Sequence, residues 1–185
     1  MKSLLAQTVF SERRTRLMAQ MQPHSIAIVP SAQLAPRNRD VDYAFRQDSD
    51  FYYLTGFDEP DAVLVLIPGR EAGECVVFCQ DRDPEMEIWH GYRAGPEGLK
   101  SEYGADQAHP VGLIDDQMPG LLDGCDRIYY AIGCDDALDA QVRGWLNAIR
   151  AQARQGAVPP TEMVMLDHLL HEMRLFKSSA EADLM

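Results

Sequence analysis

Apolar positions repeat with the period of a helix in the first part of the chain. The segment from Phe10 to Met21 predicts an amphipathic helix, and Pro23 ends it. Its apolar and basic positions are interleaved at helical spacing: Leu17, Met18 and Met21, with Arg13, Arg14 and Arg16 between them.

Four short runs of apolar and β-branched residues predict strands. Ser25–Pro30 (SIAIVP) and Ala62–Ile67 (AVLVLI) are apolar almost throughout, as expected for strands covered on both faces. Cys75–Cys79 (CVVFC) follows the second run after the turn sequence PGREAGE, so these two runs predict a hairpin with a loop longer than two residues. Arg127–Ile132 (RIYYAI) predicts a fourth strand.

Two further helices are predicted among and after these strands. Asp115–Leu122 is long enough for a short helix, and a longer helix begins behind Asp135 or Asp136, either of which can cap it. The apolar stripe of the longer helix consists of Leu138, Val142, Trp145, Leu146 and Ile149. Strands that alternate with helices, plus one hairpin, indicate the α/β class, with a mixed β-sheet flanked by helices.

The end of the chain changes in character. Pro159 and Pro160 close the α/β unit, so we expect one domain over residues 1–160 and a linker over 161–185. Ser178 and Glu181 have the spacing of a capping box, which starts a helix a few residues before Met185. Because so short a helix is marginal alone, we expect that the chain is a truncated part of a longer protein.

Composition and charge exclude several classes of function. The 185 residues are 46% hydrophobic and 25% charged, as in an ordinary globular protein. A net charge of −12 repels phosphate backbones and anionic lipids. No apolar run reaches the ~20 residues of a membrane span, and the N-terminus lacks the apolar core of a signal peptide. We therefore expect no nucleic-acid partner and no membrane partner.

The four cysteines favour a reducing compartment. They form no CxxC pair, and Cys75 and Cys79 share one face of a strand. Buried thiols are a better interpretation than disulfides or metal ligands, for Cys125 and Cys134 as well. These features predict a cytoplasmic location.

No cluster of residues makes a convincing active site. His168 and His171 lie beside Glu172, but HLLHE is not a metalloprotease motif and no second cluster completes a site. A group of acidic loop residues lacks the glycine and the final glutamate of a calcium loop, so turn and capping roles are expected: Asp40, Asp42, Asp48 and Asp50. We therefore expect no catalytic and no metal-binding residue in this chain.

Two residues outside these patterns are candidates for contacts. Trp89 lies in a polar loop (EIWHGYRAG), where it is either a core anchor or a contact residue for a substrate or partner. Arg154 ends the long helix, where it either complements the helix dipole or makes a contact of its own.

Three stretches together resemble the N-terminal part of bacterial Xaa-Pro aminopeptidases, the aminopeptidase P family. Arg37–Leu66 resembles a family segment in which a loop with Tyr and Arg leads into F-x-Y-x-T-G-F and an E-P-x-A strand. Glu87–Gly95 resembles the loop E-I-W-x-G-R-x-G, with departures at His90 and Tyr92. His171–Glu181 resembles the linker H-E-M-R-L-x-K-S that precedes the catalytic domain.

This resemblance implies an N-terminal domain of the creatinase/prolidase type, with a ribonuclease H-like motif, that is catalytically inactive alone. A pita-bread catalytic domain would follow it and hold a dinuclear manganese centre through two Asp, one His and two Glu outside this chain. The parent enzyme would be a metallopeptidase that releases the N-terminal residue preceding proline.

The resemblance also implies partners and contact residues. The domain would support a homo-oligomer and wall the cleft for proline-containing peptides, including the cleft of a neighbouring subunit. Asp40, Trp89 and Arg154 match positions that reach toward that cleft. Two alternatives stay open: a stand-alone binding or assembly protein of this fold, and the N-terminal domain of a prolidase-type Xaa-Pro dipeptidase.

Overall fold

The computed structural model of the chain describes residues 5–85 and 87–183, without the side chains of Trp89 and His90. Helices and strands alternate along it, which confirms the predicted α/β class. In chain order the elements are α1 (Gln7–Met18), β1 (Ser25–Pro30), β2 (Pro36–Asn38), β3 (Val41–Asp42), α2 (Ser49–Thr55), β4 (Val63–Leu66), β5 (Cys75–Cys79), α3 (Glu87–His90), α4 (Gly95–Tyr103), β6 (Gln107–Pro110), η1 (Val111–Leu113), α5 (Ile114–Leu122), β7 (Arg127–Tyr129), α6 (Asp136–Ala151), η2 (Ala153–Gln155), β8 (Glu162–Val164), α7 (Asp167–Leu175) and α8 (Ser179–Ala182).

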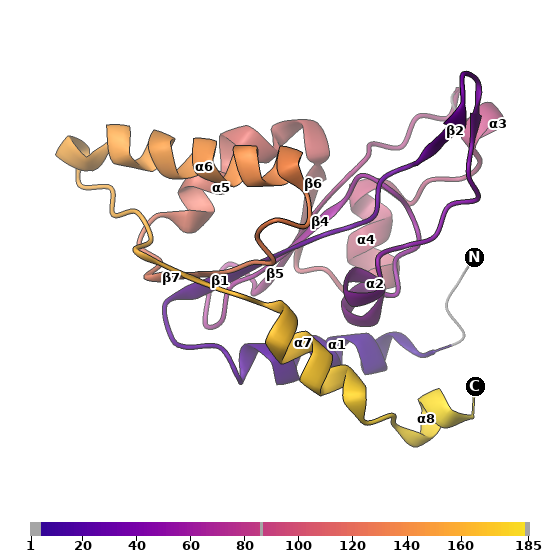
Figure 1. The fold of residues 1–185 in the computed structure, drawn as a ribbon, viewed down its shortest axis with the longest axis horizontal. Helices are drawn as coiled ribbons and strands as arrows, with labels where there is room; N and C mark the ends of the chain where they lie inside the picture. Colours follow the sequence, from indigo (N-terminus) through magenta and orange to yellow (C-terminus); the bar gives the residue numbers. More distant parts are fainter. Residues whose placement is uncertain (1–4, 86, 184–185) are drawn as a thin grey trace.

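Helices cover both faces of one mixed sheet (Figure 1). Within the described residues the sheet has six strands in the order β6-β5-β4-β1-β7-β8. Helices α5 and α6 pack on one face, and α1, α2, α4 and α7 supply the core on the other face. The hairpin β2–β3 forms a separate two-stranded sheet that projects away from the main one.

Strand β1 lies inside the sheet and gives it its mixed character. It pairs antiparallel with β4 and parallel with β7. Strands β4 and β5 form the predicted antiparallel hairpin, whereas β6 and β8 add parallel strands at the two edges. The two edge strands were not predicted, because both are short and partly exposed and lack an apolar run. Strand β7 ends at Tyr129 instead of the predicted Ile132.

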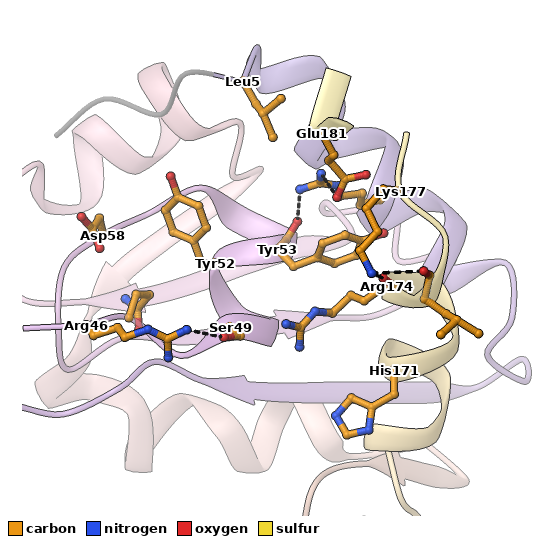
Figure 2. A pocket seen from close by; sticks show the side chains of 13 residues that line it. Leu5, Arg46, Ser49, Tyr52, Tyr53, Asp58, His171, Arg174, Lys177 and Glu181 are labelled. Atoms are coloured by element: carbon orange, nitrogen blue, oxygen red, sulfur yellow. Dashed lines mark hydrogen bonds and ion pairs between the residues drawn. The ribbon is translucent and has the colours of Figure 1, made fainter. Parts of the chain in front are cut away.

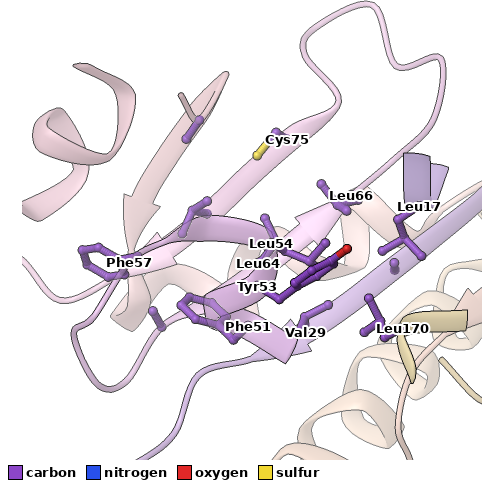
Figure 3. Close-up of a cluster of buried hydrophobic side chains, with 14 of the residues drawn as sticks. Leu17, Val29, Phe51, Tyr53, Leu54, Phe57, Leu64, Leu66, Cys75 and Leu170 are labelled. Atoms are coloured by element: carbon purple, nitrogen blue, oxygen red, sulfur yellow. The ribbon is translucent and has the colours of Figure 1, made fainter. Parts of the chain in front are cut away.

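Alternate residues of the central strands face two different hydrophobic cores. In β1, Ile26 and Ile28 face the layer of α5 and α6, whereas Ala27 and Val29 face the opposite layer. Both faces of β1 are therefore buried, which accounts for its continuous apolar sequence. Figure 3 shows the core on the face covered by α1, α2, α4 and α7. Its side chains include Leu17, Phe51, Leu54, Leu64 and Leu170.

The long helix α6 begins where the sequence predicts. The Asp135 carboxylate accepts hydrogen bonds from the backbone N–H groups of Ala137 and Leu138, at 2.9 and 3.0 Å. Trp145 in the apolar stripe is buried, and its indole N–H donates to the Asp115 carboxylate at 2.7 Å. This bond joins α6 to the first turn of α5.

The amphipathic helix predicted over Phe10–Met21 is present as α1, but two of the three arginines between its apolar positions are buried. Arg13 and Arg14 are 6% and 4% exposed, whereas Arg16 faces water. Arg14 donates to the backbone carbonyls of Leu54 (2.9 Å) and Gly104 (3.0 Å), at the C-terminal ends of α2 and α4. The last carbonyls of a helix have no intrahelical donor, so this guanidinium satisfies them.

Gly56 allows α1 and α2 to approach each other closely. It ends α2 with a φ of 66°, a left-handed conformation that residues with a side chain rarely adopt. A Cβ at this position would lie 2.6 Å from ring atoms of Phe10 in α1. Glycine is therefore required by the backbone conformation and by the packing of α1.

The sheet and its core continue past residue 160, where the sequence placed the end of the domain. Strand β8 pairs with β7, and Leu166, Leu170 and Met173 join the core that contains α1. Residues assigned to a linker thus belong to the same folded unit. Helix α8 then begins with the predicted capping box of Ser178 and Glu181. The predicted helix could extend as far as Met185, but residues 184–185 lie outside the described part of the chain.

The substitution Arg14→Met tests the buried guanidinium, because methionine keeps an unbranched apolar stem and removes the donors. We expect the free energy of unfolding to fall by about 2–4 kcal/mol, since the buried carbonyl of Leu54 and the partly buried carbonyl of Gly104 lose their donor. Urea denaturation followed by circular dichroism measures this loss. Arg16→Met on the exposed side of the same helix is the matched control, with an expected change below about 0.5 kcal/mol. Equal losses for the two variants would contradict the capping role of Arg14.

Candidate functional site

A cavity of about 780 Å³ opens between α1, α2, α7 and α8 (Figure 2). Tyr52 and Tyr53 supply aromatic surface to its wall. A concave surface of this size is a candidate binding site. In a chain of net charge −12 it is distinguished by its basic side chains: Arg13, Arg46, His171, Arg174 and Lys177.

Arg13 connects three parts of the cavity wall. Its guanidinium donates to the backbone carbonyl of Tyr53 at 2.9 Å and pairs with the Glu181 carboxylate at 2.9 Å. It also lies over the ring of Tyr53, with 4.1 Å between Cζ and the ring centroid. The carbonyl, the carboxylate and the aromatic face together compensate the buried charge. Helices α1, α2 and α8 are therefore joined at one guanidinium.

Glu181 both starts α8 and ties it to α1. Its carboxylate accepts hydrogen bonds from the backbone N–H and the hydroxyl of Ser178, each at 2.8 Å, and pairs with Arg13. Burial alone would raise the pKa of Glu181, but these hydrogen bonds and the charge of Arg13 outweigh burial and lower the pKa below its ordinary value of 4.5. The carboxylate is therefore ionised at neutral pH.

Asp50 in the first turn of α2 holds α7 in place. Arg174 forms an ion pair with its carboxylate, and His171 Nε2 lies 3.7 Å from the other carboxylate oxygen. Nearby, the Tyr53 hydroxyl donates to the backbone carbonyl of Met173 at 3.3 Å. One carboxylate thus faces two basic side chains of α7, and α7 is fixed against α2.

Gln47 fixes the backbone of the loop that carries Arg46. Its buried side-chain oxygen accepts the backbone N–H groups of Ala32 and Asp48, at 2.7 and 2.8 Å. Its amide nitrogen donates to two carbonyls within residues 57–59, at 3.2 and 2.8 Å. Asp48 caps α2, which confirms its predicted role. These four bonds satisfy the whole amide, so Arg46 extends from a rigid backbone.

Arg46 and Lys177 have no ion pair among residues 5–85 and 87–183. Arg46 is exposed, and its guanidinium makes a long hydrogen bond of 3.4 Å to the Ser49 hydroxyl. The Lys177 ammonium donates to the carbonyls of Arg174 and Leu175 at 2.8 and 3.1 Å, which closes the end of α7. The cavity therefore presents two cations that form no ion pair with a described carboxylate, of which Lys177 still acts electrostatically on Glu181.

The three predicted cleft residues lie at two ends of the molecule. Asp40 is exposed in the turn of the β2–β3 hairpin, and Trp89 belongs to α3, at the same end of the long axis (Figure 1). Arg154 is exposed in η2, beyond α6 at the opposite end. One chain does not bring Arg154 together with the other two. The Trp89 side chain lies outside the described residues, so its contact role stays a prediction.

A protein-family profile described as "Aminopeptidase P, N-terminal domain" matches residues 10–129, which is more than half of the chain. The chain belongs to this family. The Xaa-Pro aminopeptidase of Escherichia coli is 39% identical over 180 residues, which are 97% of this chain and 41% of that protein.

Solved structures agree with this assignment to the aminopeptidase P N-terminal domain family. The structure of Pseudomonas aeruginosa aminopeptidase PepP matches with a TM-score of 0.96 and 55% identity, over 100% of this chain and 42% of that one. A low-pH form of Escherichia coli aminopeptidase P matches with a TM-score of 0.93 and 39% identity, over 98% of this chain and 41% of that one. The chain thus spans about two fifths of the length of these relatives.

The cysteines of this aminopeptidase P domain are free, and three of the four are buried. Cys75, Cys79 and Cys125 are buried as predicted, but Cys134 is exposed, contrary to the prediction. Burial raises the pKa of Cys79 to about 12 and that of Cys125 to about 11, so these two thiols stay protonated at neutral pH.

Neither a metal-binding cluster nor a membrane-spanning helix is found in the described part of the chain. No three His, Cys, Asp or Glu side chains there are arranged to hold an ion, and His171 instead lies beside Asp50. The helices within residues 5–85 and 87–183 are too short or too polar to cross a bilayer.

The basic cavity was not predicted, although one signal for it is present in the sequence. Phe10, Arg13 and Leu17 are spaced i, i+3 and i+7, so they share one face of α1. An arginine between two buried apolar residues has to find polar partners inside the protein. Its partners Tyr53 and Glu181 are distant in the sequence, so no local pattern identifies them.

The substitution Glu181→Gln removes the charge that pairs with Arg13 and keeps an acceptor for the capping box. A lowered folded-state pKa stabilises the protein above pH 4.5, and this contribution is lost as the pH falls through the folded pKa. We expect a loss of about 1 kcal/mol at pH 7 that shrinks below about pH 4.5. Urea denaturation across pH 3–7 measures it, with the exposed Glu172→Gln as the control. A loss that is equal at every pH would contradict the ion pair.

Proposed function

We propose that this chain is the non-catalytic N-terminal domain of an Xaa-Pro aminopeptidase, a hydrolase that releases the N-terminal residue preceding proline. The family match over residues 10–129, in relatives more than twice as long, carries this proposal. We place the catalytic machinery in the remaining length of such a protein. The free cysteines fit a reducing compartment, and we propose a cytoplasmic location.

The roles of the described carboxylates support this division of labour. Asp48 and Asp135 cap helices, whereas Asp50 and Glu181 hold α7 and α8. These carboxylates thus cap helices or pair with basic side chains, and they do not converge on one centre. A dinuclear manganese site needs several carboxylates and a histidine around one point, and we place it in a pita-bread domain that follows. When bound there, the metal ions supply the activated water.

We also propose that the domain walls the substrate cleft and supports a homo-oligomer. Asp40 and α3 lie at one end of the molecule and Arg154 at the other. If all three positions contact a peptide in the same cleft, at least two copies of the domain have to contribute to that cleft. Val41 and Tyr43 beside Asp40 are 52% and 59% exposed. Exposed apolar side chains of this kind suit a surface that is covered in an assembly.

Peptidase assays test the assignment of activity to the following domain. We expect the purified 185-residue chain to show no hydrolysis of a Xaa-Pro peptide with added manganese, because the water-activating groups are placed elsewhere. A longer protein that contains this chain and the following domain should release the residue before proline. Turnover by the 185-residue chain would contradict its non-catalytic role. Inactivity of the longer protein on Xaa-Pro peptides would contradict the proposed substrate class.

Trp89→Ala in the longer protein tests the proposed contact with peptide. We expect kcat/KM for longer peptides to fall about 30-fold, the factor that corresponds to the loss of a contact worth about 2 kcal/mol, with a small change in Tm. Trp145→Ala is the matched control, because Trp145 is buried and bonded to Asp115. This control should lower Tm strongly and change kcat/KM little in the folded fraction. A Trp89 variant that behaves like the control would instead show that Trp89 is a core anchor.

A further inference from the structure

The cavity between α1, α2, α7 and α8 is locally positive in an acidic chain. Among the described residues that line it, four are arginine or lysine and two are acidic, Asp58 and Glu181. The chain as a whole has a net charge of −12. Glu181 neutralises Arg13, and Asp50 beside the cavity neutralises Arg174. Lys177 bonds the carbonyls at the end of α7 and also acts on Glu181. Among the described lining residues, the Arg46 guanidinium is therefore the cation that is left for an external partner, and Asp58 is the acidic residue that forms no ion pair with it.

Arg46 is prepared for such a partner by the loop that carries it. Gln47 anchors the backbone with four hydrogen bonds, so little backbone freedom is lost when the Arg46 guanidinium is bound. The Ser49 hydroxyl lies beside it, and Figure 2 shows Arg46 and Arg174 reaching into the cavity from opposite sides of Ser49. A guanidinium with free donors matches the planar geometry of a carboxylate.

Apolar side chains accompany these charges where α7 ends. Leu175 lines the cavity and is 59% exposed, and Phe176 next to it is 82% exposed. A surface that combines arginine, tyrosine and exposed apolar side chains has the composition of a protein interface. Such a surface indicates a protein segment as the occupant, in preference to a small anion.

We propose that this cavity seats a carboxylate-bearing segment of the domain that follows in the same polypeptide, with Arg46 as its anchor. This inference rests on the proposed function, because the relatives have most of their length outside the matched region. Helices α7 and α8 form one wall of the cavity and are the last elements of the described chain. A domain attached directly to that wall has a high effective concentration at the cavity, so a modest set of contacts is enough to seat it.

Hydrogen exchange on the longer protein tests the proposal with the variant Arg46→Glu. We expect about tenfold faster exchange of backbone amides in residues 46–58 and 171–181, because the reversed charge repels the carboxylate that covers them. Arg143→Glu is the matched control, since Arg143 is exposed on α6, in the layer on the other face of the sheet. We expect the control to exchange like the wild type in both segments.

Three results would overturn the proposal. The first is equal exchange in Arg46→Glu and wild type. The second is equal acceleration in Arg46→Glu and Arg143→Glu. The third is protection of these amides in the wild-type protein that disappears when the protein is diluted, because a second copy of the protein would then be what covers the cavity. If circular dichroism shows that the reversal unfolds the domain, Arg46→Gln replaces it, with a smaller acceleration of about threefold expected in the same segments. Exchange does not depend on turnover, so an inactive longer protein would count against the proposed function and leave this result readable.

Discussion

Two guanidinium groups buried beneath the first helix hold the domain together. A buried arginine is costly unless its donors find partners, and the ends of helices carry carbonyls that lack donors. Arg14 meets two such carbonyls, and Arg13 meets a third together with Glu181 and the face of Tyr53. The guanidinium donors and the acceptors at the helix ends therefore satisfy each other's hydrogen bonds. The convergence of α1, α2 and α4 therefore depends on polar contacts as well as on apolar burial.

The position of the cavity follows from the same contacts. Because Arg13 joins the first helix to α8, the first and last parts of the described chain meet beside α2. Asp50 then fixes α7 through Arg174, and the space enclosed by these helices collects basic side chains from separate regions of the sequence. A strongly acidic chain thus acquires a cavity rich in basic side chains by folding.

Most of the sheet and the long helix α6 could be predicted from the sequence, because burial on two faces leaves continuous apolar runs and burial on one face leaves a helical stripe. Strand β8 could not, since Glu162–Val164 is short and partly exposed and is defined by its pairing with β7. The cavity was missed for a related reason. The sequence placed Arg13 between the apolar positions of an amphipathic helix, but its partners are known only once the chain has folded.

The central place of β1 has a consequence for biosynthesis. The hairpin β4–β5 closes from neighbouring sequence, but β1 reaches its parallel partner β7 only after about a hundred further residues have been made. During translation, the edge of β1 that pairs with β7 therefore stays unpaired, and the apolar strand β1 stays exposed there, until β7 has been synthesised. We expect the nascent chain to be most prone to aggregation during this interval, and to lose that risk when β7 and then β8 leave the exit tunnel.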